Sequence, residues 1–384
     1  MNNISNKHKT YFAFLAGLFI VYFIVFIKTF ISLNDEFHFA FKSKENYSFH
    51  KKYSKKLHHI RDENNLSNLI VREGVEDLLF TNIHNEGKRT IIFQGDSWIN
   101  QIETAKNDSQ KISFNDLKKF AKEKKIKTIS AGIPSYSPSL MNLQLDVLEN
   151  DFNIKPEIVI AFINQLDFGD ELCRYKKNKI YTNGKFKKIL TESDHEGIGW
   201  YNYSKLYGIS DINFSYNSDL LKSFHLINFK INYSLKKSLK RIKKKILRSQ
   251  LEEKKCYNNQ IEKYLINPKQ IEIQYFEKTI TEYLDKIDQK KHIKKLILVS
   301  FPHKKHFAKS NNQNTHFNYN VAESINKVII SKDNIIHLDF SKILLNEPNF
   351  DYINIWAKDE VHLNPDNHSK LFIKNILKEI NKLL

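Results

Sequence analysis

The amino-acid sequence predicts a three-layer α/β/α sandwich with a parallel sheet, tethered by one N-terminal transmembrane helix. Over residues 86–384, short apolar runs alternate with segments of helical spacing, which is the pattern of parallel strands joined by crossover helices. One run, EIVIAFI, is continuously apolar, as expected of a strand covered on both faces. A single uncharged stretch near the N-terminus is long enough to span a bilayer.

The uncharged stretch covers residues 11–27, and its apolar character continues to Leu33. With Lys28 snorkelling, it reaches the roughly 20 residues that a bilayer core requires. It is longer than the apolar part of a signal peptide, and no small-residue cleavage site follows. Lys7 and Lys9 precede it closely, which favours a cytoplasmic N-terminus. The sequence therefore predicts a single-pass cell-membrane protein whose large domain lies on the periplasmic or extracellular side.

The sequence predicts four segments along the chain. They are a cytoplasmic tail (1–10), a transmembrane anchor (11–33), a Lys-rich stalk with peripheral helices (34–85) and one domain (86–384). The sheet does not need residues from about 173 to 293, which predicts an insertion that is mostly helical from Leu220 onward. Its segment SLKKSLKRIKKKILR is apolar on one helical face and basic on the other. A surface helix and a helix lying on an anionic membrane both fit that pattern.

The predicted strands of the domain each end in turn residues or lead into a helix. They are residues 89–93, 127–130, 157–163, 295–300 and 335–340. Helical spacing predicts helices at 114–125, 140–152 and about 365–384. Strands that alternate with helices in this way belong to one parallel sheet.

Composition excludes some classes of protein. A hydrophobic fraction of 41% and an aromatic fraction of 13% predict a packed core rather than a disordered chain. The net charge of +18 is spread along the whole chain rather than gathered in one patch, so we predict no nucleic-acid partner. Cys173 and Cys256 are the only cysteines, and both a disulfide and two free thiols fit the sequence.

Two motifs carry chemistry. The first strand leads into Gly95, Asp96, Ser97 and Trp98, which places a hydroxyl at the carboxyl end of a strand, where α/β proteins bind ligands. Alone, this turn is better explained by Asp96 or Ser97 capping a helix. Near the C-terminus, KDEVHLNPDNH places Asp359 and His362 on one short loop. A serine becomes a nucleophile when an imidazole takes its proton and a carboxylate holds that imidazole.

These motifs resemble the SGNH (GDSL-like) hydrolase superfamily, whose catalytic serine lies in a GDS block and whose Asp and His lie in a C-terminal D-x-x-H block. The resemblance implies a flavodoxin-like fold, with Ser97, Asp359 and His362 as the catalytic residues. It also implies an oxyanion hole formed by the backbone of Ser97, by Gly132 in SAGIPSYS and by Asn164 in FINQLDFGDE. Gln165 replaces the family's usual Asp, and Asn164 as a loop-forming residue stays an alternative.

The resemblance implies a serine esterase or acyltransferase acting on acyl esters, above all O-acetyl esters, of cell-surface carbohydrate. A transferase would require a multispanning partner to deliver its acyl donor across the membrane. Two alternatives stay open. One is a catalytically degenerate, anchored protein that binds or assembles glycans, and the other is an esterase that acts on lipids.

Further polar residues are candidate ligands. His195, His303 and His306 have no carboxylate or cysteine at ligand spacing, so we predict no metal and no cofactor. The acidic loop of Asp167, Asp170 and Glu171 follows the third strand. It could contact a substrate or pair with nearby Lys and Arg side chains, and the sequence does not separate these roles.

Overall fold

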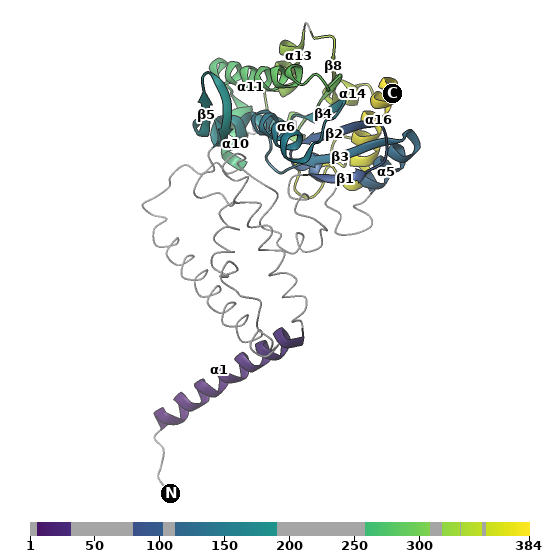
Figure 1. Ribbon diagram of the computed structural model, residues 1–384. Coiled ribbons are helices and arrows are strands. Elements are labelled where there is room, and N and C mark those ends of the chain that lie inside the picture. The colour runs from purple at the N-terminus through teal and green to yellow at the C-terminus, as the bar shows by residue number, and fades with distance from the viewer. Residues whose placement is uncertain are drawn as a thin grey trace. The chain divides into compact units, whose positions relative to one another are not determined.

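The computed structural model describes residues 6–31, 80–102, 112–189, 258–307, 317–330, 332–347 and 351–384. The chain divides into two compact units. The first contains helix α1 (Asn6–Ile31), and the second contains all other described residues as an α/β domain (Figure 1). The predicted stalk up to residue 79 and the basic segment at 234–248 lie outside the described residues.

Helix α1 is apolar over most of its length. Its window Thr10–Ile27 has a mean hydropathy of 2.4, and none of it is buried against protein. At 1.5 Å per residue, a helix of 26 residues extends about 39 Å, which exceeds the roughly 30 Å of a bilayer core. Length and composition fit the predicted anchor, and they fit a signal sequence equally well.

A six-stranded sheet in the order β1-β3-β2-β4-β7-β8 forms the middle layer of the domain. Its strands are β1 (Thr81–His84), β2 (Arg89–Gly95), β3 (Ile126–Gly132), β4 (Ile158–Phe162), β7 (Lys295–Ser300) and β8 (Ile335–Asp339). All strands of this sheet except β1 are parallel to one another, which confirms the predicted sheet. Edge strand β1 pairs antiparallel with β3 and falls within a segment predicted as stalk and helices. Only Ile83 of its sequence TNIH is buried, so no apolar run marks it.

Helices cover both faces of this sheet and complete the three layers (Figure 1). One face carries α6 (Pro138–Phe152), α11 (Gln270–Gln289) and α13 (Val321–Ile329), and the other carries α5 (Ile112–Lys124), the π-helical η5 (His368–Ile373) and α16 (Lys374–Leu383). Short elements are α4 (Ser97–Asn100), α7 (Gln165–Asp170), α12 (Lys304–Phe307), α14 (Phe340–Leu345) and α15 (Pro365–Asn367). Because both faces are covered, every residue of β4 is buried.

The described part of the region predicted as an insertion contains one hairpin and several helices. Its described elements are η3 (Glu171–Tyr175), η4 (Lys176–Asn178), the hairpin β5 (Lys179–Thr182) with β6 (Lys185–Ile189), α10 (Asn258–Ile266) and α11. Helix α11 contacts both α6 and α13. It therefore belongs to the helical layer, in the crossover from β4 to β7. Residues 190–257, between β6 and α10, lie outside the described residues.

An aromatic cluster lies where the parallel strands end. Trp98 packs on Phe162, Phe301 and Phe372, with ring centroids 5.0, 4.9 and 5.5 Å apart. These side chains come from the ends of β2, β4 and β7 and from η5, and all are buried. Each such burial contributes about 1.5–3 kcal/mol. The cluster therefore holds together the strand ends from which the candidate site residues project.

Candidate active site

Strand β2 turns directly into α4, and Ser97 is the first residue of that helix. Gly95 has φ +151°, and an added Cβ would lie 2.9 Å from Cγ1 of Ile99, so the turn requires glycine. Asp96 is the N-cap and accepts a hydrogen bond from the backbone N–H of Trp98 at 2.9 Å. Capping is thus provided by Asp96, and the hydroxyl of Ser97 is left for another partner.

That hydroxyl begins a hydrogen-bonded chain of three side chains. Ser97 Oγ lies 2.6 Å from His362 Nε2, and His362 Nδ1 lies 2.6 Å from Asp359 Oδ2. An ionised carboxylate only accepts, so Nδ1 carries the ring proton and Nε2 accepts from the serine. The hydrogen bond from His362 holds the pKa of the Asp359 carboxyl well below its usual range. The arrangement can move the serine proton to the imidazole and stabilise the resulting charge.

The loop that carries Asp359 and His362 is shaped by the same carboxylate. Asp359 Oδ1 accepts from the backbone N–H groups of Val361 and His362, both at 3.0 Å, and Glu360 takes φ +60° in this turn. The side chains of His362 and Asp359 are 21% and 52% exposed. One carboxylate therefore orients both the imidazole and its loop, at a site open to solvent.

Gly132 ends β3 beside Gly95 in the parallel register. An added Cβ would lie 2.3 Å from the backbone N of Asn100 and 2.5 Å from the backbone C of Ile99. Ile133 N donates to Gly95 O at 3.0 Å, which continues the register into the loop. Glycine at 132 therefore lets α4 pack directly on β3, at the carboxyl ends of the strands, where Ser97 also lies.

Replacing Gly132 by alanine is expected to destabilise the domain by about 1–3 kcal/mol and to lower turnover, because the backbone that must move belongs to α4. Urea unfolding and hydrolysis of p-nitrophenyl acetate measure the two effects. Gly184→Ala is the control, since nothing lies within 4 Å of its added Cβ although φ is +71°. It should lose some stability and keep turnover. A Gly132→Ala chain with wild-type stability and turnover would contradict the close packing.

Asn164 follows β4 and is the N-cap of α7. Its Oδ1 accepts from Leu166 N at 2.8 Å, and its backbone N donates to Asp167 Oδ2 at 2.8 Å, which completes a capping box. The loop-forming role left open by the sequence is therefore present. The side-chain nitrogen of Asn164 makes no hydrogen bond within the part of the chain that the structure describes, so it is free to donate to a further acceptor there.

Gln165, which departs from the family pattern, joins neighbouring elements. Its Nε2 donates to Phe301 O at 2.9 Å and to Asn320 Oδ1 at 3.0 Å. Its Oε1 accepts from Val321 N at 3.0 Å. The side chain thus ties the end of β4 to the residues after β7 and to the start of α13, which gives the departure a structural cause.

The acidic loop after β4 is buried and internally bonded. Asp170 pairs with Arg174 at 3.2 Å, and Asp167 serves the capping box of α7. Burial, followed by the nearby charge of Asp96, raises the pKa of Asp167 well above its usual value. Burial also raises the pKa of Asp96 to about 7. Of the two roles considered from the sequence, internal pairing is the one found here.

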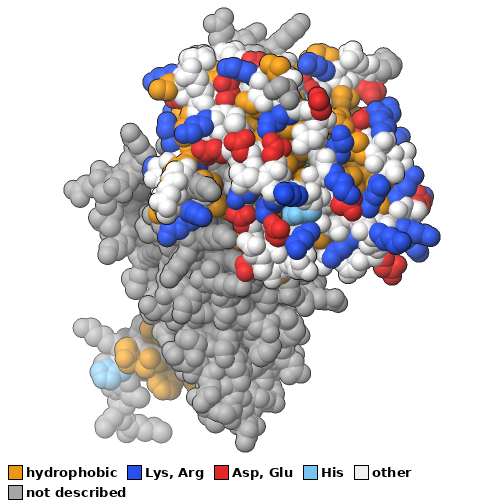
Figure 2. All heavy atoms as spheres, turned by 45° about the horizontal axis from the view of Figure 1, so that its top comes forward, with side chains coloured by type: hydrophobic (Ala, Val, Ile, Leu, Met, Phe, Trp, Pro, Cys, Tyr) orange, Lys and Arg blue, Asp and Glu red, His pale blue; other side chains and the backbone are white. Residues whose placement is uncertain are grey.

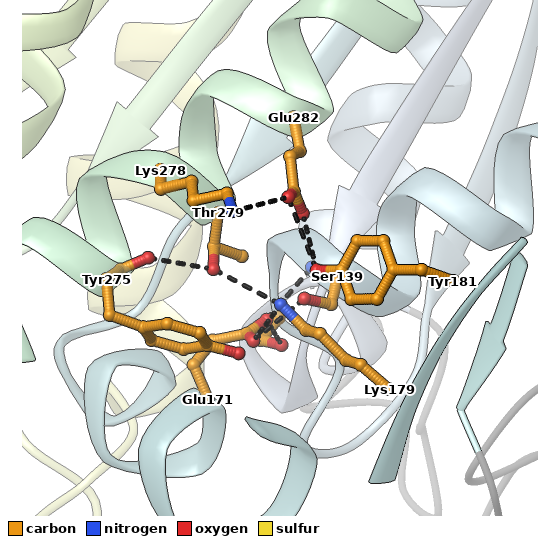
Figure 3. A network of polar contacts seen from close by, with 9 residues as sticks. Ser139, Glu171, Lys179, Tyr181, Tyr275, Lys278, Thr279 and Glu282 are labelled. Atoms are coloured by element: carbon orange, nitrogen blue, oxygen red, sulfur yellow. Dashed lines mark hydrogen bonds and ion pairs between the residues drawn. The ribbon is translucent and has the colours of Figure 1, made fainter. Parts of the chain in front are cut away.

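Glu171 and Lys179 form a buried ion pair that joins four segments (Figure 3). Lys179 Nζ lies 3.1 Å from Glu171 Oε2, and the side chains are 2% and 0% exposed. Glu171 also accepts from Ser137 Oγ at 2.5 Å and Ser139 Oγ at 2.7 Å, at the start of α6. Lys179 donates to Thr279 Oγ1 in α11 at 3.2 Å. The pair therefore fixes the loops that follow β3 and β4 relative to each other.

Breaking this pair from one side is expected to destabilise the domain by about 3–5 kcal/mol, because the other charge stays buried without a partner. Lys179→Met and Glu171→Gln test this by urea unfolding. Combining the two substitutions should recover more than half of the loss. Glu157→Gln is the control, because its partner Lys294 is 69% exposed and such pairs contribute about 0–1 kcal/mol. Single variants no weaker than this control would contradict the prediction.

The histidines considered as metal ligands have protein partners where they are described. His303 Nδ1 accepts from Lys305 N at 3.1 Å, and burial lowers the pKa of His303 to about 3. His306 Nε2 lies 3.0 Å from Tyr319 O, whereas His195 lies outside the described residues. Among the described residues, no group of three His, Cys, Asp or Glu side chains is placed to hold a metal ion.

No protein-family model and no curated protein matches the sequence. Among solved structures, the chain is similar to an acetyl xylan esterase at 15% identity (TM-score 0.37, covering 77% of this chain and 99% of that chain). It is also similar to the lipase/acylhydrolase from Enterococcus faecalis at 12% identity (TM-score 0.34, 77% and 97%). A psychrotrophic esterase from Pseudoalteromonas sp. has 10% identity (TM-score 0.34, 77% and 98%). The mostly parallel sheet, covered by helices on both faces, makes the domain an α/β/α sandwich.

Proposed function

We propose that this chain is a serine ester hydrolase that works through an acyl-enzyme on Ser97. The observation that carries the proposal is the hydrogen-bonded chain from Ser97 through His362 to Asp359. Ser97 Oγ attacks the ester carbonyl while His362 Nε2 takes its proton, and His362 then returns that proton to the leaving alcohol. Water attacks the acyl-enzyme in the same way, which releases the carboxylic acid and restores Ser97.

The oxyanion of the tetrahedral intermediate needs fixed donors, each worth a few kcal/mol. We assign the backbone N–H groups of Ser97 and Gly132 and the side-chain nitrogen of Asn164 to this role. All three residues lie at or just beyond the carboxyl ends of adjacent parallel strands. The unused nitrogen of Asn164 in the described part of the chain supports its inclusion.

For the natural substrate we propose acyl esters, above all O-acetyl esters, of cell-surface carbohydrate. We further propose that α1 anchors the chain in the membrane, with the domain on the periplasmic or extracellular side. Lys7 and Lys9 before the apolar window support this orientation. Cys173 is disulfide-bonded, and Cys256 is the only other cysteine in the chain. A structural disulfide is typical of exported domains. The side chains of His362 and Asp359 are partly exposed to solvent, which suits a bulky polar substrate.

The test uses the full chain in detergent with p-nitrophenyl acetate and a fluorophosphonate probe. We expect steady release of p-nitrophenol and a probe adduct on the peptide that contains Ser97. Absence of both turnover and labelling would overturn the esterase proposal in favour of an anchored protein that binds or assembles glycans.

Two comparisons in the same assay narrow the substrate. Faster turnover of acetyl esters than of long-chain esters supports carbohydrate acetates, whereas the reverse order favours an esterase acting on lipids. A sugar added as acceptor distinguishes hydrolysis from transfer, because only a transferase yields acetylated sugar. In a cell, such a transferase would need a multispanning partner to supply acyl groups.

A further inference from the structure

A second histidine of the C-terminal segment, His368, contacts the turn that carries Ser97. His368 is 2% exposed and lies at the start of η5. Its Nε2 lies 3.0 Å from the backbone O of Trp98, and its Nδ1 lies 2.7 Å from Ser113 Oγ at the start of α5. No step of the proposed reaction uses this ring, although it belongs to the same sequence motif as His362.

The partners of His368 determine its tautomer. A backbone carbonyl only accepts hydrogen bonds, so Nε2 must carry the ring proton and donate it to Trp98 O. Nδ1 then has a lone pair, which accepts from the hydroxyl of Ser113. Burial lowers the pKa of His368 to about 3, which agrees with a neutral ring that has one donor and one acceptor, both bonded.

His368 binds a carbonyl of the short helix α4. Around α4, Asn100 N donates to Asp96 O, Gln101 N to Ser97 O and Ile102 N to Ile99 O. Among the described residues, no backbone N–H therefore donates to Trp98 O. Carbonyls at the end of a helix need a partner from elsewhere, and the N–H of the His368 ring provides it.

Trp98 also connects the two histidines through its ring. Its centroid lies 6.4 Å from that of His362 and 6.5 Å from that of His368. One short segment of chain thus reaches the nucleophile turn at two points, Ser97 Oγ and Trp98 O. We propose that His368 is a positioning residue that holds Trp98 O, and through it keeps Ser97 Oγ on His362 Nε2, an inference that rests on the proposed esterase function.

Three variants separate positioning from stability. His368→Leu removes the donor to Trp98 O, and we expect kcat for p-nitrophenyl acetate to fall about 10- to 100-fold with KM nearly unchanged, since small misplacements of reacting groups cost up to about 100-fold. His368→Gln keeps an amide N–H near the position of Nε2 and should restore kcat to within about fivefold. Ser113→Ala leaves the ring N–H on Trp98 O and should keep kcat within about threefold while lowering the melting temperature.

The outcomes distinguish this inference from the function on which it rests. An active wild type with unchanged kcat in His368→Leu, or with equal losses in His368→Gln and His368→Leu, overturns the positioning role alone. Nitrogen NMR gives a readout independent of activity, and we expect an Nε2–H tautomer that does not titrate between about pH 5 and 8. A titrating His368 would also overturn the role. A wild type without Ser97-dependent turnover overturns the esterase function, and the positioning role with it.

Discussion

Ser97→Ala is expected to lower the turnover of p-nitrophenyl acetate by about 10⁴-fold or more while the fold stays intact. The loss follows because alanine has no oxygen to form the acyl-enzyme, and His362 alone cannot replace it. Stability should change little, since Asp96 rather than Ser97 caps α4 and Ser97 is only half-buried. Steady-state kinetics and the mass of the acylated protein measure the effect, and urea unfolding checks the fold.

Ser341→Ala is the matched control for this substitution. Ser341 is also a half-buried serine at the start of a short helix after a strand. Its hydroxyl accepts from Asn320 Nδ2 at 2.7 Å, whereas that of Ser97 bonds a histidine. We expect turnover within about twofold of wild type in the control. Comparable activity in Ser97→Ala and Ser341→Ala would exclude Ser97 as the nucleophile.

The central strands could be predicted because buried strands consist mostly of apolar residues. Strand β4 has the sequence IVIAF and is buried throughout, so it can be recognised from its own apolar residues without knowing which strands pair with it. Strand β1 buries one residue, and its existence depends on the free edge of β3. The hairpin of β5 and β6 is rich in lysine, and it is stabilised partly by the burial of Lys179 against Glu171. A lysine in such a setting looks like a surface residue in the sequence.

The polar residues of the site divide in the same way. Ser97, Asp359 and His362 stand in motifs that resemble those of a known superfamily, which predicted their roles although Ser97 and His362 lie 265 residues apart. The structure brings their side chains into contact. His368 stands in the same motif, but its partners lie 255 and 270 residues away. The role of Gln165 likewise depends on residues after β7. The spacing of residues along the chain does not indicate such distant partners, so the roles of His368 and Gln165 could be found only from the structure.

Asp359→Asn is expected to lower kcat by about 10⁴-fold, the scale found when the carboxylate of such a group becomes an amide. The amide would present N–H groups to Nδ1 of His362, which favours the tautomer with the proton on Nε2. That nitrogen could then no longer accept the proton of Ser97. The turn should survive, because the remaining amide oxygen can still accept from the backbone N–H groups of Val361 and His362. Steady-state kinetics on p-nitrophenyl acetate measures the loss, and circular dichroism checks the fold.

Glu360→Gln is the control, since Glu360 is the adjacent exposed carboxylate and pairs with Lys304 at 2.6 Å. It should keep kcat within about twofold. The pH dependence gives a second test, because the hydrogen bond from His362 holds the pKa of Asp359 below its usual range. A carboxyl with a depressed pKa stays ionised at every pH above its usual value of about 3.9, so it protonates only in stronger acid. The deficit of Asp359→Asn should therefore persist at every pH above about 5, and a deficit below tenfold would mean that this carboxylate does not hold the catalytic tautomer.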